Sequence, residues 1–205
     1  MEVPEPGAEV VDEQFDRADW DGLDLAGVTF RRCHFLEASM VELRVERCVF
    51  EECTLTGVRL NAAQFTDTAL RSSTLSKAVL FGTSFHSCSL LGTSFVGADV
   101  RGMRLSDTDL SYAILRGVDA AKLDLSGTRM REIDATDADL RGTDLRGCDL
   151  SYARLQGANL AGADLRGATV EAINWTTVDL TGVQIDMAQA LAVAMSYGAV
   201  IDSPQ

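Results

Sequence analysis

Apolar residues recur at every fifth position of this 205-residue chain. From Phe15 to Ile185, all 35 positions divisible by five hold an apolar residue, with no insertion or deletion. We call this residue the centre of its pentad. The position two before each centre is mostly small, and 15 of the 17 glycines lie two after one of these centres. Such regularity predicts a repeat architecture, because a short unit can bury its apolar residue only by stacking on its neighbours.

A period of five residues matches neither the 3.6-residue period of an α-helix nor the two-residue period of a flat β-strand. It suits a short extended side followed by a corner, where glycine tolerates a positive φ. Corners that all bend in one direction wind the chain into a solenoid, with the centres inside and neighbouring coils paired as strands. Proline would remove a donor from that ladder. The prolines, at positions 4, 6 and 204, all lie outside the repeat, so we predict an all-β solenoid.

The register divides the chain into four segments. Residues 15–185 are expected to form the solenoid, and residues 1–14, which carry acids and prolines, a mobile N-terminal extension. Residues 186–198 predict a short helix, and residues 199–205 are left as a tail. The sequence contains neither an apolar run long enough to span a membrane nor a basic stretch leading into an apolar one at its start. A cytoplasmic location is therefore expected.

The predicted C-terminal helix, DMAQALAVAMSYG, has start and stop signals. Asp186 followed by Gln189 resembles a capping box, and Gly198 is a suitable C-terminal stop. So short a helix is not stable alone and must pack on something. It either caps the last coil only or also pairs with a second chain. The candidate dimer-interface residues are Met187, Ala190, Leu191, Ala194, Met195 and Tyr197.

Neither the cysteines nor the histidines indicate a catalytic or metal site. All five cysteines lie two before a centre, the small inward position, and are predicted to be buried filler. The spacing of Cys48 and Cys53 is unlike the short paired spacings of zinc sites. His34 and His86 flank centres and should point outward, and no serine or cysteine nucleophile is evident at a pentad position that would pair with them. We therefore expect no enzyme, no metal and no cofactor.

The pentads ADLRG at 138–142 and 163–167 and ANLAG at 158–162 match the A(D/N)LXX consensus of the pentapeptide-repeat family, which the chain resembles over residues 13–186. This resemblance implies a right-handed quadrilateral β-helix with four pentads per coil; a period of five alone leaves the number of sides open. Residues 163–198 further resemble the fluoroquinolone-resistance branch of the family, the mycobacterial MfpA and plasmid-borne Qnr proteins. That resemblance implies a dimeric rod that binds DNA gyrase and imitates duplex DNA in shape and charge.

The charge of the chain agrees with such mimicry, since 31 acids against 18 bases give a net charge of −13. With four pentads per coil, positions 20 apart stack on one face. Two columns of aspartates then form, and we predict that they bind the partner: Asp99, Asp119, Asp139 and Asp179 in one, and Asp124, Asp144 and Asp164 in the other. An aspartate before the centre can also support the turn backbone, so that alternative stays open for each of them. The bases are too few and too dispersed to indicate nucleic-acid binding.

Other functions stay open beside gyrase binding. The chain could be a scaffold solenoid for an unrelated protein, with its charge serving solubility, and an even charge on all four faces would favour this. Ice binding through a threonine ladder is disfavoured, because the threonines at 68, 83, 93, 108, 128 and 143 occupy the inward position. Phe81, Leu91 and Val96 should face outward and are a weaker candidate contact.

Overall fold

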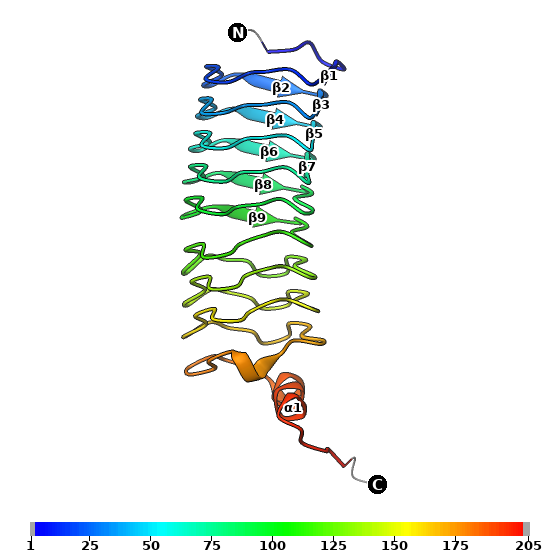
Figure 1. Cartoon of the computed structure of the whole chain (residues 1–205), viewed down its shortest axis with the longest axis vertical. Helices are drawn as coiled ribbons and strands as arrows, with labels where there is room; N and C mark the ends of the chain where they lie inside the picture. The colour runs from blue at the N-terminus through cyan, green and yellow to red at the C-terminus, as the bar shows by residue number, and fades with distance from the viewer. Residues whose placement is uncertain (1–2, 203–205) are drawn as a thin grey trace.

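The computed structural model describes residues 3–202, which form a rod with the N-terminus at one end and a helix at the other (Figure 1). Its strands all pair in parallel with a partner 20 residues away. One sheet has the order β1-β3-β5-β7 and the other β2-β4-β6-β8-β9. The strands are β1 (Glu9–Val11), β2 (Asp24–Ala26), β3 (Thr29–Arg31), β4 (Arg44–Glu46), β5 (Val49–Glu51), β6 (Gln64–Thr66), β7 (Ala69–Arg71), β8 (Ser84–His86) and β9 (Arg104–Ser106). A register of 20 residues means four pentads per coil, so the predicted quadrilateral solenoid is confirmed.

Beyond β9 the coils continue without regular strands. Single parallel bridges replace them and keep the 20-residue register, as in Asp119 with Asp139 and Arg129 with Asp149. The lower coils in Figure 1 therefore stack like the upper ones although no arrows are drawn there. We name the four faces after their first centres: the Val10, Phe15, Trp20 and Leu25 faces.

The core is a column of centres. From Phe15 onward all of them are buried except Leu105, Leu180 and Ile185, which are partly buried. The N-terminal coils hold stacked aromatic rings, such as Phe30 and Phe50 with centroids 4.9 Å apart, whereas leucines fill the later coils. This column removes a long apolar surface from water, which is the main stabilising contribution to the rod.

The inward position two before each centre is filled as predicted. The five cysteines are free and buried, and burial raises the pKa of their thiols, to about 12 at Cys53 and Cys148. The six inward threonines are buried too. The hydroxyls of Thr68, Thr83, Thr93, Thr108 and Thr143 donate to backbone carbonyls, as from Thr83 to Leu60 at 2.7 Å. Such bonds satisfy polar groups that would otherwise be costly to bury.

The rod begins earlier than the sequence predicts. Within the expected mobile extension of residues 1–14, β1 pairs with β3, and the Gly7 amide donates to the Gly27 carbonyl at 3.2 Å. The reason is Val10, an apolar residue at a centre position that adds one more pentad to the register. Residues 1–2 of the extension and 203–205 of the expected tail lie outside the described residues.

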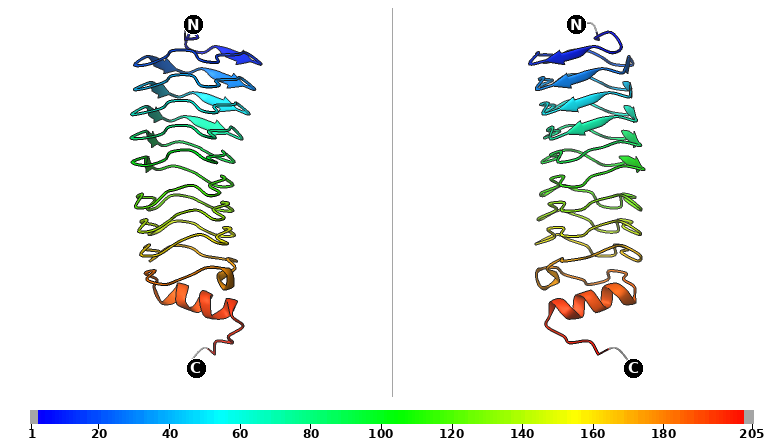
Figure 2. Two further views of the ribbon diagram at one scale, coloured as in Figure 1. Left: turned by 60° about the vertical axis from the view of Figure 1, so that its left-hand side comes forward. Right: turned by 90° about the vertical axis from the view of Figure 1, so that its right-hand side faces the viewer.

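A short 3₁₀ helix, η1 (Trp175–Thr177), and the helix α1 (Met187–Ser196) close the C-terminal end (Figure 2). The predicted capping box is confirmed, because the Asp186 carboxylate accepts from the Gln189 amide at 3.2 Å and the Gln189 side chain accepts from the Asp186 amide at 2.9 Å. Gln189 is buried and also donates to the Leu165 and Ala168 carbonyls, which ties α1 to the last coil. The helix therefore covers the open end of the core.

Candidate functional site: two aspartate columns and the terminal helix

The predicted aspartate columns lie on two adjacent faces. On the Trp20 face, bridges join Asp119 to Asp139 and then, through Asn159, to Asp179; Asp99 is one coil before Asp119. On the Leu25 face, bridges join Asp124, Asp144 and Asp164 in succession. Parallel pairing without insertions brings these positions together, since each coil repeats the phase of the one before.

Each aspartate of the columns supports its own corner. One carboxylate oxygen accepts the backbone N–H two residues later, at 3.2 Å in Asp119 and 2.9 Å in Asp179. The same bond forms at the other five column positions. Asn159 makes it too, at 3.2 Å, so the bond needs a side-chain oxygen but no charge. The turn-support alternative therefore applies to every member of both columns.

Four of the seven column aspartates are also paired with an arginine two residues later. The closest N–O distances are 2.7 Å for Asp99–Arg101, 2.5 Å for Asp139–Arg141, 2.5 Å for Asp144–Arg146 and 2.6 Å for Asp164–Arg166. These side-chain hydrogen bonds lower the pKa of all four carboxyls, at Asp164 to about 2. The pairs hold each carboxylate in a fixed direction but also neutralise much of its charge.

Three column aspartates differ from these four. Asp119, Asp124 and Asp179 form no ion pair within residues 3–202. Asp119 and Asp124 interact with arginines of the columns only at longer range, so these three carboxylates keep more of their negative charge than the four paired ones. The sequence pattern treats all seven alike, whereas the structure separates them by the residue that follows the centre.

The corner between the two columns is almost bare. It is occupied by Gly102, Gly142, Gly162 and Gly182, with Lys122 as the one long side chain in that stretch. Glycine suits the positive φ of 75° at Gly162, but a side chain is tolerated at many other corners, as at Tyr152 with a φ of 62°. The Phe81 ring lies over Gly102 and the Lys122 side chain over Gly142, whereas no side chain lies within 4 Å of a Cβ placed on Gly162 or Gly182. A partner could therefore approach the backbone closely at Gly162 and Gly182, between the two rows of carboxylates.

Charge is uneven around the rod. On the Phe15 face the acids exceed the bases by only one: Glu13, Asp16, Glu37, Asp134 and Asp137 against Arg17, Lys77, Arg116 and Arg154. On each of the other three faces the acids exceed the bases by three. The excess is thus centred on the Leu25 face and is not confined to the two faces that carry the columns.

Helix α1 presents an apolar side to solvent. Met187 is 76% exposed, Met195 62% and Tyr197 65%, with Leu191 between them also exposed. Ala190 and Ala194, the smaller members of the predicted interface, are half-buried. Large apolar side chains on an outward helix face are unusual in a monomer, because single exposed residues are common but contiguous ones are not.

Other candidate chemistry is sparse. No group of three or more His, Cys, Asp or Glu side chains in residues 3–202 is placed to hold a metal ion. His34 and His86 lie on different faces, both exposed. The His86 Nδ1 lies 2.8 Å from the Ser106 hydroxyl, a contact that the 20-residue register could have revealed from the sequence. Phe81, Leu91 and Val96 are exposed but belong to three different faces, so they do not form one patch.

The model of the family "Pentapeptide repeats" matches eight copies, at residues 63–102, 103–134, 128–167 and 158–190. The chain belongs to the pentapeptide-repeat family. The matched span begins at residue 63 and leaves out the coils before it, which have the same 20-residue register. No curated protein sequence matches the chain.

Solved structures extend the likeness to nearly the whole rod. A trypsin-treated variant of QnrB1, described as a plasmid-mediated fluoroquinolone resistance protein, is 26% identical with a TM-score of 0.83, covering 95% of this chain and 97% of its own. Full-length QnrB1 gives 24% identity, a TM-score of 0.84 and coverage of 94% and 98%. HetL, a pentapeptide-repeat protein involved in heterocyst differentiation regulation in the cyanobacterium Nostoc, is 24% identical with a TM-score of 0.54, and the match covers 86% of this chain and 84% of HetL. None of the helices in the described residues is long and apolar enough to cross a membrane.

Proposed function

We propose that this protein is a cytoplasmic DNA mimic that binds DNA gyrase at a surface meant for duplex DNA. Binding there reduces supercoiling and the number of gyrase–DNA complexes that fluoroquinolones trap, which protects the cell. The likeness to QnrB1 along almost the whole chain carries the proposal. The protein acts by occupying a surface and needs no catalytic group.

The arrangement of charge supports this proposal. Carboxylates in one column repeat at about 4.8 Å along the rod, and the phosphates of one DNA strand repeat at about 3.4 Å along the helix axis. The backbone N–H bonds and the arginine pairs fix the carboxylates in direction, so little conformational freedom is lost on binding. The scaffold alternative would be favoured by an even charge on all four faces, and the smaller acidic excess of the Phe15 face argues against it.

The decisive assay is DNA supercoiling by purified gyrase, titrated with this protein with and without a fluoroquinolone. We expect inhibition of supercoiling and fewer drug-trapped cleaved complexes. If gyrase neither binds the protein nor changes its activity, the proposal is wrong.

Two matched variants locate the surface. Asp119→Asn with Asp124→Asn removes two unpaired column charges and keeps the corner bonds, as Asn159 does naturally. Glu52→Gln with Asp149→Asn removes the same net charge from the Val10 face. We expect the first variant to bind gyrase roughly tenfold more weakly, equivalent to about 1.4 kcal/mol, and the second to bind nearly normally. Equal losses would point to net charge alone and against the columns.

We also propose that the protein is a homodimer joined through the outward side of α1. Covering Met187, Leu191 and Met195 removes apolar surface that the rod itself leaves exposed. Leu191→Glu should give monomers in sedimentation equilibrium, while Leu23→Glu, at an exposed leucine near the other end of the rod, should leave the dimer intact. An unchanged mass for Leu191→Glu would contradict this interface.

A further inference from the structure

The first coil, residues 8–27, leaves a strand edge open at the end of the rod opposite α1 (Figure 2). Strand β1 is outermost in its sheet, and β3 is its one neighbour within residues 3–202. Gln14 and Asp19 continue this edge on the next two faces. Both are exposed, and neither their backbone amides nor their backbone carbonyls have a hydrogen-bond partner in the described part of the chain. We call β1, Gln14 and Asp19 the first-coil edge.

The second coil shows in which direction these backbone groups point. The amides of His34 and Ser39 donate to carbonyls of the first coil, at 2.9 Å and 2.8 Å. By the same register the amides of Gln14 and Asp19 point out of the end of the rod, where no coil precedes them. The first-coil edge therefore has the geometry of a strand ladder that can accept one more strand.

The Leu25 side of this end is less suited to pairing. The Gly7 amide donates to the Gly27 carbonyl at 3.2 Å, so the chain enters the rod at the corner between the Leu25 and Val10 faces. Pro4 and Pro6 precede this corner and have no N–H to donate to a further strand. An added strand is therefore expected along the Val10, Phe15 and Trp20 sides of the first coil.

Negative charge is concentrated along the same edge. Residues 9–24 contain seven acids and one base, a net charge of −6, and with the second coil included residues 9–47 contain ten acids and five bases, a net charge of −5. Glu9, Asp12 and Asp24 pair with arginines of the second coil, and Arg17 pairs with Glu37. Four exposed acids of the first coil form no ion pair within residues 3–202: Glu13, Asp16, Asp19 and Asp21.

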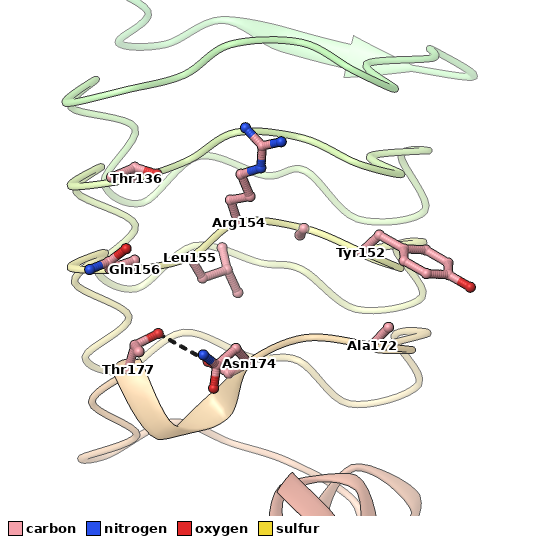
Figure 3. A pocket seen from close by; sticks show the side chains of 9 residues that line it. Thr136, Tyr152, Arg154, Leu155, Gln156, Ala172, Asn174 and Thr177 are labelled. Carbon is pink, nitrogen blue, oxygen red and sulfur yellow. Dashed lines mark hydrogen bonds between the residues drawn. The ribbon is translucent and has the colours of Figure 1, made fainter.

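The hollows between later coils offer no such excess of charge. The hollow drawn in Figure 3, of about 250 Å³, is lined by Arg154 and Asn174, and Arg154 contacts the buried Asp134 carboxylate at 3.6 Å. A neighbouring hollow of about 290 Å³ is lined by Arg116 and Arg154 but also by Glu132 and Asp134, so its charges cancel. A charged partner is therefore attracted more strongly to the first-coil edge than to these hollows.

We propose that the first-coil edge binds an extended basic segment of another protein, which adds a strand to β1 and continues past Gln14. The open backbone groups select an extended segment, because they pair with the N–H and C=O groups of a strand. Side chains of a strand alternate between its two sides. Arginines or lysines at every second position then lie near carboxylates such as Asp16, and apolar residues between them cover Val10, which the rod leaves partly buried.

Charge excludes the other occupants of this edge. A second copy of the chain would bring two acidic edges together, and a nucleic acid carries the same sign of charge as the edge. Stacking of one rod on the far end of another is blocked because α1 covers the last coil. The inference is independent of the proposed function, since it concerns a different end of the rod and a different kind of partner.

The probe is an eight-residue peptide of alternating arginine and valine with blocked ends, and its Kd is measured by isothermal titration calorimetry. The control is the same peptide N-methylated at every residue, which keeps the charges but cannot pair as a strand. We expect the unmodified peptide to bind at least about tenfold more tightly, because only it forms backbone hydrogen bonds with the edge. Equal Kd values for the two peptides would overturn the inference.

Two matched variants locate the bound peptide. Asp16→Asn with Asp19→Asn removes two unpaired charges of the edge and keeps the oxygens that accept backbone amides. Asp67→Asn with Asp107→Asn removes the same net charge at the corner between the Leu25 and Val10 faces, further along the rod. The first variant should weaken peptide binding severalfold and the second hardly at all. Equal losses would mean attraction to net charge alone and would contradict a site at this edge.

Amide hydrogen exchange, followed by NMR, tests the added strand directly. The amides of Gln14 and Asp19 should exchange rapidly in the free protein and at least severalfold more slowly with the peptide bound, because they become donors to it. Unchanged exchange at both amides with the peptide bound would place it elsewhere and overturn the inference. If neither peptide binds, the acids serve only to keep other strand edges away, and the inference is wrong while gyrase binding is unaffected.

Discussion

The two halves of the rod solve the same packing problem with different residues. In the N-terminal half, regular strands surround stacked phenylalanines, and many corners carry charged side chains at positive φ, such as Glu42 and Glu52. In the C-terminal half, single bridges surround leucines and most corners are glycine. The coil is thus set by the pentad and not by a particular core residue, which leaves each half free to build a different surface.

Ion pairs follow the same division. Arg32 pairs with Asp12 and Arg17 with Glu37, each across one coil, at 2.7 Å and 3.1 Å. In the later half, pairs within a single corner, as in Asp139 with Arg141, are added to coil-to-coil pairs such as Asp109 with Arg129. The first pattern joins coil to coil, whereas the second stabilises each corner and leaves the coil edge open. The candidate gyrase surface lies where the corners are open.

The largest difference should appear in the core. Phe50→Ala is expected to lower the free energy of unfolding by about 3–5 kcal/mol, and Leu150→Ala, in the same column, by about 2–5 kcal/mol. We expect the phenylalanine to cost more, because Phe50 also loses its stacked contact with Phe30, worth about 0.5–1.5 kcal/mol. Urea unfolding monitored by circular dichroism measures both. Equal losses would mean that ring stacking adds nothing to this half.

A smaller effect distinguishes the corners. Gly162 and Glu42 occupy equivalent positions, with φ of 75° and 57°. Gly162→Ala should destabilise by about 1–2 kcal/mol, because an added Cβ is strained at this φ even though it meets no neighbour within 4 Å. Glu42→Gly should change stability little, since relief of that strain is offset by the greater freedom of glycine in the unfolded chain.

The stability of Gly162→Ala, measured by chemical unfolding and compared with its gyrase binding, also tests why the corner carries glycine. If Gly162→Ala is neutral in stability yet weakens gyrase binding, the glycine corner is kept bare for access. If it is destabilising and binds normally, backbone conformation alone accounts for the glycine.

The sequence predicts the fold well because the information is local and repeated in every pentad. The inward cysteines and the stacking of the aspartates follow from the position of each residue within its pentad, and the Asp186 capping box follows from a local sequence motif. Phase does not specify side-chain conformation, so the pairing of Asp139 with Arg141 and the packing of Arg131 on Tyr152 emerge only from the structure. The charge balance of each face could be calculated once four sides are known. The pentad of Val10 is not predicted, because the acids and prolines around it are typical of a mobile extension.

The smallest expected effect concerns acid stability. The hydrogen bond from Arg166 lowers the pKa of Asp164 to about 2, below its ordinary value of 3.8. A depressed pKa means that the carboxylate contributes stability above its ordinary value and loses it as the pH falls toward 2. Asp164→Asn keeps an oxygen for the corner bond, as Asn159 does, and removes the ion pairs with Arg166 and Arg146.

We therefore expect urea unfolding of Asp164→Asn to depend less on pH between about pH 4 and pH 2 than that of the wild-type protein. Asp12→Asn, at a coil-to-coil pair whose carboxyl pKa is also lowered by a hydrogen bond from its arginine, provides the comparison from the other half. Both changes should be small, because pairs that water reaches contribute little, and both should shrink in about 1 M salt. If Asp164→Asn has the same pH dependence as the wild-type protein, the corner pairs of the C-terminal half do not stabilise the fold. Their arginines would then be retained for what they do at the surface, which is to hold the carboxylates in line along the glycine corner.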